Sequence, residues 1–72
     1  MDLKELREAA GLIIIDVAYH IGVAESTVRN WEKGRTIPRL TPEQLDKICH
    51  LYNCSYTDWM QAYKETRKNT NK

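Results

Sequence analysis

The sequence predicts an all-α fold, a compact bundle of five helices. Apolar residues recur at spacings of three and four along most of the chain, and no segment alternates with the period of two that a strand requires. The 72 residues suit a single small domain, and 42% hydrophobic with 29% charged residues is a globular balance. We therefore expect one domain over residues 1–65 and a basic, flexible tail without apolar anchors over residues 66–72.

The first three expected helices follow one another closely. Residues 2–10 carry apolar side chains at helical spacing and end at Gly11. A second apolar stripe begins at Ile14 and ends at Gly22, because glycine can adopt the left-handed conformation that closes a helix. A third helix over residues 25–33 begins about three residues later. Two helices joined by a tight glycine turn form a helix-turn-helix arrangement, which holds the second helix at a steep angle to the first.

The last two expected helices carry clear start signals. A loop with glycine and proline separates them from the third helix. Thr41 followed by proline, with Gln44 three residues on, is typical of an N-cap and capping box. Asn53 can end that helix in a left-handed conformation, and Ser55 with Asp58 forms a second capping box for the final helix.

The charge of the chain is unevenly distributed. The formal net charge is only +1, yet residues 29–39 and residues 64–72 each carry four basic side chains against one acidic one. The rest of the chain is net negative. Because counterion release from nucleic acid depends on local positive charge, the near-neutral total does not exclude a nucleic-acid partner.

Other features of the composition narrow the class of protein. A chain this short leaves little room for a deep active-site cleft, which favours a binding module over an enzyme. No apolar run is long enough to span a membrane, and two cysteines are too few for a disulfide-stapled secreted domain. We expect a cytoplasmic protein without a cofactor.

Three neighbouring side chains could in principle bind a metal. Cys49, His50 and Cys54 are all zinc-ligand types, but Cys49 and His50 are adjacent on a helix and point apart, and no second ligand pair exists. A small buried thiol is the favoured interpretation of Cys49, and we expect no metal.

The third helix has two chemically different faces. Ala24, Val28 and Trp31 gather on one side when residues 25–33 are wound at about 100° per residue. The opposite side carries side chains suited to base edges and phosphates, namely Glu25, Ser26, Arg29, Asn30 and Lys33. Any surface helix has a polar face, so an ordinary solvated face is the alternative. The position between a glycine turn and a basic loop favours a recognition helix.

Several short motifs in the chain together resemble those of a known protein family. These are, in order, Gly11-Leu12, Val17-Ala18, Gly22-Val23, Ser26-Thr27-Val28, Trp31-Glu32-Lys33-Gly34 and Pro38. In order and spacing they resemble the lambda-repressor-like (Cro and xenobiotic-response-element type) helix-turn-helix family, over about residues 3–60. The resemblance implies a five-helix domain of the kind found in phage repressors, bacterial regulators and antitoxins. It also implies sequence-specific binding to duplex DNA as a dimer on a palindromic operator.

The resemblance assigns roles by position. The residues that fall where the family contacts bases are Glu25, Ser26, Arg29 and Asn30. Those that fall where it binds phosphates are Thr27, Lys33, Arg35, Thr36 and Arg39. Arg7 and Glu32 fall where the family often pairs its first helix with the end of the recognition helix. A surface pair there would contribute only about 0 to 1 kcal/mol, and we expect it to position the third helix.

The start of the second helix departs from the family. The family usually has Thr-Gln or Ser-Gln there, a capping hydroxyl followed by a glutamine that links a phosphate to the recognition helix. This chain has Ile13-Ile14 instead, so the expected cap is missing and the phosphate contact lacks its usual residue. Two interpretations remain. Either Ile14 packs inward and Ile13 is a tolerated surface residue, or Ile13, Ile14 and Ile15 form a contact patch for a partner protein.

The function that these observations predict is a DNA-binding transcriptional regulator, a phage-like repressor that acts as a dimer. Tyr56 and Tyr63, which flank Trp59 on the final helix, are the expected self-association surface. The alternative is a protein-interaction module of the same fold, an antitoxin or adaptor, whose main partner is another protein.

Overall fold

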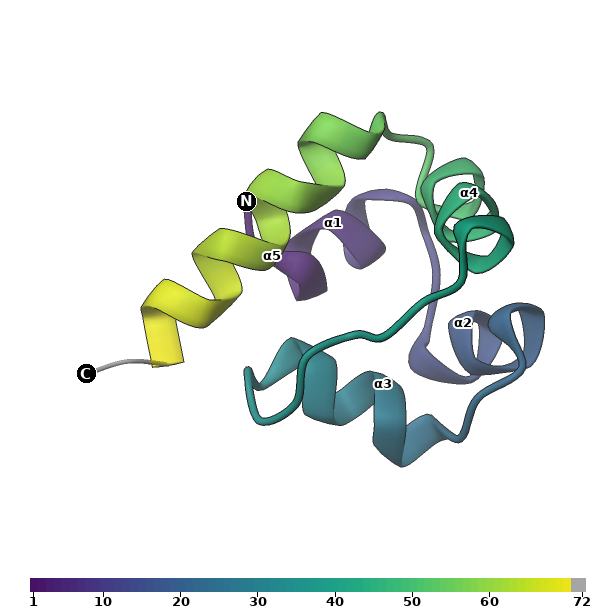
Figure 1. The fold of residues 1–72 in the computed structure, drawn as a ribbon, viewed down its shortest axis with the longest axis horizontal. Helices are drawn as coiled ribbons and strands as arrows, with labels where there is room; N and C mark the ends of the chain where they lie inside the picture. Colours follow the sequence, from purple (N-terminus) through teal and green to yellow (C-terminus); the bar gives the residue numbers. More distant parts are fainter. Residues whose placement is uncertain (71–72) are drawn as a thin grey trace.

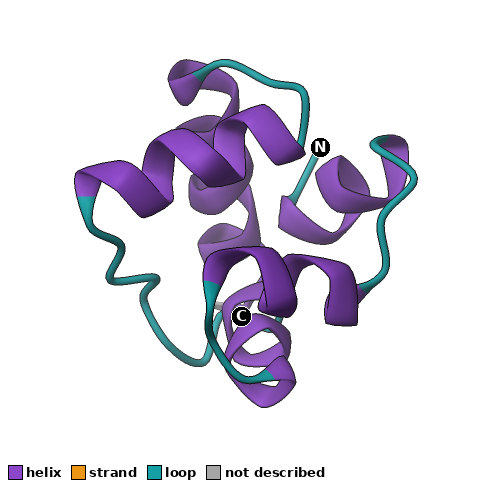
Figure 2. Ribbon diagram, turned by 90° about the vertical axis from the view of Figure 1, so that its right-hand side faces the viewer, coloured by secondary structure: helices purple, strands orange, loops and turns teal. Residues whose placement is uncertain are grey.

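The computed structural model describes residues 1–70, which fold into five helices (Figure 1). In chain order these are α1 (Leu3–Ala9), α2 (Ile14–Ile21), α3 (Glu25–Glu32), α4 (Pro42–Leu51) and α5 (Tyr56–Thr70). Throughout this described part of the chain the elements are helices joined by loops, with no strand (Figure 2). The all-α, five-helix fold class that the sequence predicts is confirmed.

The helix ends follow the local signals of the sequence. Gly22 has φ 85° and Asn53 has φ 53°, the left-handed conformations expected at the ends of α2 and α4. At the start of α4 the Thr41 Oγ1 accepts from the Gln44 N–H at 3.1 Å, and the Gln44 Oε1 accepts from the Thr41 N–H at 2.9 Å. Two orphan backbone donors are thereby satisfied, which fixes where α4 begins.

The start of α2 is stabilised differently. The side chain of Ile13 has no hydrogen-bond acceptor, so it cannot cap the helix as a serine or threonine would. The Asp16 carboxylate instead accepts from the Ile13 N–H at 3.1 Å. Half of a capping box is therefore present, and α2 still begins at Ile14.

The core lies where the five helices converge. α1 packs against α5 and α3, α2 packs against α3 and α4, and α4 packs against α5. Val17, Val28 and Ile48 are fully buried at the centre, each with 0% of its surface exposed. Because Val28 belongs to α3, the core fixes the rotation of that helix about its own axis. No helix within residues 1–70 is long and apolar enough to cross a membrane.

The last helix is longer than expected. The sequence predicts a domain that ends at residue 65 and a flexible tail over residues 66–72, but α5 continues to Thr70. Thr66 is buried at 3% exposure, and its Oγ1 accepts from the Leu3 N–H at 2.9 Å. The Thr66 hydroxyl holds the beginning of this segment against α1, and a polar contact of this kind leaves no apolar periodicity in the sequence. The remainder of the expected tail, residues 71–72, lies outside the described residues.

Candidate nucleic-acid interface

The two faces of α3 divide as the helical wheel predicts except at Ala24, which is the N-cap residue before the first turn and is exposed. Val28 and Trp31 are buried, at 0% and 5% exposure. On the opposite face Glu25, Ser26 and Arg29 are exposed, and Asn30 beside them is half-buried. All four side chains predicted to contact bases therefore lie on the part of α3 that reaches the surface.

Two of these side chains pair with each other. The Arg29 Nη2 lies 3.4 Å from the Glu25 Oε1 across one helical turn, and both side chains are about half exposed, at 51% and 47%. A pair this long and this exposed contributes little to stability. Both side chains can therefore turn toward a ligand at small energetic cost.

The ion pair between α1 and α3 is much more buried than a surface pair. The Arg7 Nε donates to the Glu32 Oε2 at 2.7 Å and its Nη2 donates to Oε1 at 3.1 Å, with the two side chains 8% and 7% exposed. A third donor of Arg7 binds the Leu12 carbonyl at 2.9 Å. The hydrogen bond to Glu32 raises the pKa of the Arg7 guanidinium. This bidentate pair fixes the C-terminal end of α3 against α1.

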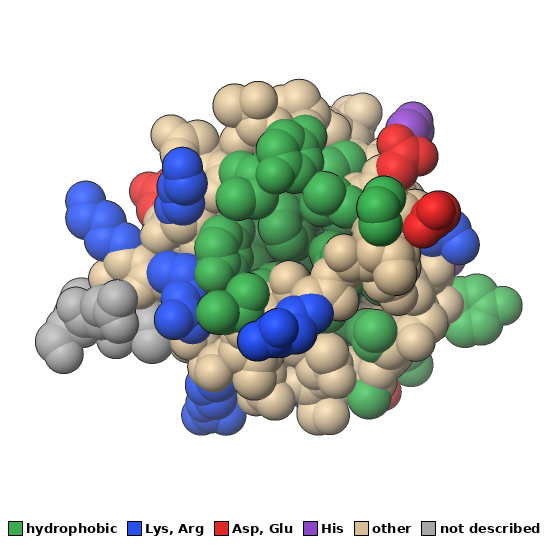
Figure 3. All heavy atoms as spheres, viewed as in Figure 1, with side chains coloured by type: hydrophobic (Ala, Val, Ile, Leu, Met, Phe, Trp, Pro, Cys, Tyr) green, Lys and Arg blue, Asp and Glu red, His purple; other side chains and the backbone are tan. Residues whose placement is uncertain are grey.

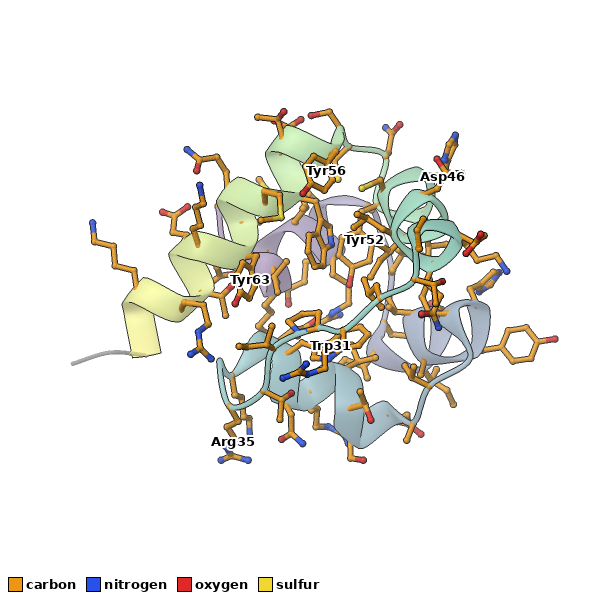
Figure 4. The ribbon with its side chains drawn as sticks, in the orientation of Figure 1. Trp31, Arg35, Asp46, Tyr52, Tyr56 and Tyr63 are labelled. Carbon is orange, nitrogen blue, oxygen red and sulfur yellow. The ribbon has the colours of Figure 1, made fainter. Side chains whose placement is uncertain are left out.

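The loop after α3 places basic side chains next to the polar face of the helix. Gly34 reverses the chain with φ 71°, and the Arg35 N–H donates to the Asn30 carbonyl at 2.9 Å. Arg35 and Arg39 are exposed, and Arg35 extends away from the helices in Figure 4. Together with Thr27, Asn30 and Thr36 they line one open surface groove, whose lining also includes Val23, Trp31 and Ile37. Of the predicted phosphate ligands, only the exposed Lys33 does not line it.

One basic residue of this groove was not predicted from the sequence. Arg67, on the last turns of α5, lines the groove as well, and its Nη1 donates to the Gly34 carbonyl at 2.8 Å. The only signal in the sequence is the cluster of positive charge over residues 64–72, which is equally typical of a flexible tail.

A helix-turn-helix family model, of the lambda-repressor and Cro type, matches residues 3–59. The chain belongs to this helix-turn-helix family. Its members are DNA-binding regulators, so the domain is a DNA-binding helix-turn-helix domain, with α2 and α3 as its two motif helices. The match ends eight residues before Arg67. No match was found among curated proteins or among solved structures.

Tyr56, Trp59 and Tyr63 form the aromatic stripe of α5. The stripe lies beside a hollow between α5 and α4. Figure 3 shows hydrophobic side chains gathered there, with lysine and arginine side chains along its left and lower edge. In the same orientation Figure 4 places Tyr56 and Tyr63 on the α5 side. Tyr56 is 56% exposed, whereas Tyr63 is half-buried and its ring stacks on buried Trp59, with centroids 6.2 Å apart. Of the two predicted interface residues, Tyr56 is the more accessible.

The three isoleucines at the start of α2 do not share one environment. Ile14 packs against the core, whereas Ile13 and Ile15 are 60% and 51% exposed. Tyr19, one turn after Ile15, is 82% exposed. An apolar surface therefore exists on the outer side of α2, although Ile14 contributes mainly to the interior.

The two cysteines are free thiols, of which Cys49 is buried and Cys54 is half-buried. Burial raises the pKa of Cys49, and it raises the pKa of Cys54 to about 11, so both are protonated near neutral pH. Within residues 1–70, no three histidine, cysteine or acidic side chains come close enough together to hold a metal ion.

Proposed function

We propose that this helix-turn-helix domain is a cytoplasmic, sequence-specific transcriptional repressor, and not an enzyme, that binds a palindromic operator as a dimer. In this proposal Glu25, Ser26, Arg29 and Asn30 contact base edges in the major groove. The phosphates are bound by Thr27, Lys33, Arg35, Thr36 and Arg39. The observation that carries the proposal is the exposed polar face of α3 directly beside the arginine-lined groove.

The buried ion pair supports this assignment. A recognition helix must present its side chains at a fixed angle, because a base contact depends on placement to within a fraction of an ångström. Val28 and Trp31 fix the rotation of α3, and the bond between Arg7 and Glu32 fixes its far end. The backbone of α3 is thus held rigidly, although the side chains on its outer face take no part in the core.

The length of the domain, compared with the spacing of operator half-sites, supports a dimer. Its greatest extent is 32 Å, and the half-sites of a helix-turn-helix operator lie about 34 Å apart on one face of the duplex. One domain with one recognition helix cannot occupy both. The aromatic side of α5, with Tyr56 exposed at its edge, is the surface through which we propose that two copies associate.

Selection from random duplex DNA tests the proposal as a whole. The protein should enrich a palindrome whose half-sites are one helical turn apart, and a variant with both Arg29→Ala and Asn30→Ala should lose the preference at two positions of each half-site while remaining folded. Tyr56→Asp is a better interface variant than a change at Tyr63, which stacks on the core. It should give monomers in sedimentation with unchanged helical circular dichroism. Salt-sensitive binding without any preferred sequence would contradict the repressor proposal.

A second candidate function rests on the exposed apolar residues of α2. Ile13, Ile15 and Tyr19 are each more than half exposed, which suits a contact with another protein. In that case the domain is an antitoxin or adaptor. Changing both Ile13 and Ile15 to Lys distinguishes the two functions. If a protein is the main partner, the double change should remove that contact on α2. If DNA is the main partner, the enriched operator sequence should stay the same.

A further inference from the structure

The end of α5 is bonded to the loop that carries the predicted phosphate-binding arginines. Figure 1 shows the C-terminal part of α5 beside the turn that follows α3. The contact is specific, since the Arg67 Nη1 donates to the Gly34 carbonyl at 2.8 Å across 33 positions of sequence. Both partners are shielded, because Gly34 is buried and Arg67 is half-buried.

The Gly34 carbonyl requires such a partner. Gly34 has φ 71°, so the chain leaves the helical path at this residue. A buried backbone carbonyl without a hydrogen bond is costly, and a guanidinium is a strong donor to it because the bond is charge-assisted. Arg67 therefore stabilises the left-handed turn from which the next residues depart.

The loop that follows Gly34 carries two of the proposed phosphate ligands. Arg35 follows Gly34 directly, and Arg39 lies four residues further on, so the direction of the turn determines where both side chains begin. Arg35, Arg39 and Arg67 line the same groove, although Arg67 comes from a different helix. One guanidinium thus holds the turn by its backbone and adds positive charge beside the other two.

We propose that Arg67 is a positioning residue for DNA binding, which orders the loop over residues 33–40 so that Arg35 and Arg39 meet the phosphate backbone. The inference rests on the proposed function, because it assumes that this loop contacts DNA. It adds a role for the part of α5 that follows the family match, which ends at residue 59.

Duplex-binding measurements with three variants test this role. Arg67→Met keeps the aliphatic stem but removes the donor, and Arg67→Lys keeps a donor and the charge. Lys68→Ala is the matched control, since it removes one positive charge from the neighbouring exposed position. We expect Arg67→Met to weaken duplex binding about tenfold and Lys68→Ala only about two- to threefold, with Arg67→Lys close to the unchanged protein.

A double-mutant comparison separates positioning from direct phosphate contact. In a chain with Arg35→Ala and Arg39→Ala, the loop has no arginines left to position, so Arg67→Met should weaken binding only about two- to threefold further, as expected for the loss of one positive charge. An undiminished tenfold loss in that background would overturn the proposal, because Arg67 would then bind phosphate itself. Equal losses for Arg67→Met and Lys68→Ala would overturn it too, because only charge would matter.

Amide hydrogen exchange in the free protein gives a readout without DNA. The Arg35 N–H, bonded to the Asn30 carbonyl at 2.9 Å, should exchange faster in Arg67→Met than in the unchanged protein and in Lys68→Ala. Unchanged exchange would show that Arg67 does not order the loop. If the unchanged protein binds no duplex at all, the proposed function has failed; if it binds and Arg67→Met binds equally well, only the positioning role has failed.

Discussion

α3 takes part in two arginine–carboxylate pairs, one on each of its faces, and the two pairs differ in distance and in exposure to solvent. On the inner side Glu32 receives two hydrogen bonds from Arg7, the shorter at 2.7 Å, with both side chains less than a tenth exposed. On the outer side Glu25 and Arg29 approach only to 3.4 Å, with about half of each side chain in solvent. The same two chemical groups thus form a fixed contact between α1 and α3 and a loose contact within α3.

This difference shows how one short helix serves both structure and recognition. The inner pair is desolvated and bidentate, so breaking it leaves a buried charge without its partner. The outer pair exchanges readily with water, and its side chains can bind something else. Residue type alone does not separate the two roles, whereas burial does.

The largest effect should come from the inner face. Trp31→Ala removes a side chain that is 5% exposed and should cost about 3 to 5 kcal/mol of unfolding free energy, because the cavity cannot close around a small domain's core. We expect the variant to be largely unfolded by circular dichroism and to bind no DNA for that reason alone. A folded Trp31→Ala that fails to bind would assign Trp31 to the interface.

The two carboxylates give a matched pair of substitutions. Glu32→Gln leaves the buried Arg7 without its charged acceptor and should lower the free energy of unfolding by about 2 to 3 kcal/mol. Glu25→Gln makes the same chemical change on the outer face and should alter it by less than about 0.5 kcal/mol. Chemical denaturation of both proteins measures the difference. Similar values for the two would mean that burial does not distinguish these pairs.

Local patterns predicted the fold well, and long-range polar contacts were the part they missed. The capping box of Thr41 and Gln44 and the left-handed turn at Gly22 depend on neighbours within a few residues, so the sequence contains the whole signal. Thr66 and Arg67 instead bind backbone atoms of Leu3 and Gly34, each more than 30 positions away. A polar segment anchored by such bonds has no apolar periodicity, and it therefore resembles a tail.

The sequence likewise predicted the local features of the candidate site but not the burial of its ion pair. The exposed residues of α3 follow from helical geometry once Val28 and Trp31 are assigned to the core. The degree of burial of the Arg7–Glu32 pair did not follow, because it depends on how α1, α3 and the chain at Leu12 close around it. The family resemblance gave the positions of that pair but not its environment.

The outer face should respond in binding and not in stability. Arg29→Ala and Asn30→Ala should each leave the free energy of unfolding within about 0.5 kcal/mol, because neither side chain belongs to the core. Each should weaken operator binding by about 1 to 3 kcal/mol and relax preference at one position of each half-site. Melting curves and operator affinities measured side by side check both statements. If both variants keep the full sequence preference, α3 does not contact the bases.

The loop beside the outer face should act through charge. Changing Arg35 and Arg39 together to Ala should weaken operator and random duplex similarly, because phosphates carry no sequence information. The logarithmic dependence of affinity on salt should become shallower by nearly two units per domain, at about 0.9 for each phosphate that is no longer neutralised. Titrations at several salt concentrations measure this slope. A weakening confined to the operator would mean that these arginines contact bases.

The smallest expected effect tests the loose pair itself. Glu25→Gln removes a carboxylate that both repels phosphates and competes with DNA for Arg29, so binding to random duplex should strengthen, by less than about 1 kcal/mol. Binding to the operator should not strengthen in parallel if Glu25 accepts a hydrogen bond from a cytosine amino group, since glutamine is a poorer acceptor. The ratio of operator to random affinity should therefore fall while melting stays unchanged. A ratio that stays the same would place Glu25 outside the base contacts and leave Ser26, Arg29 and Asn30 to provide the sequence preference.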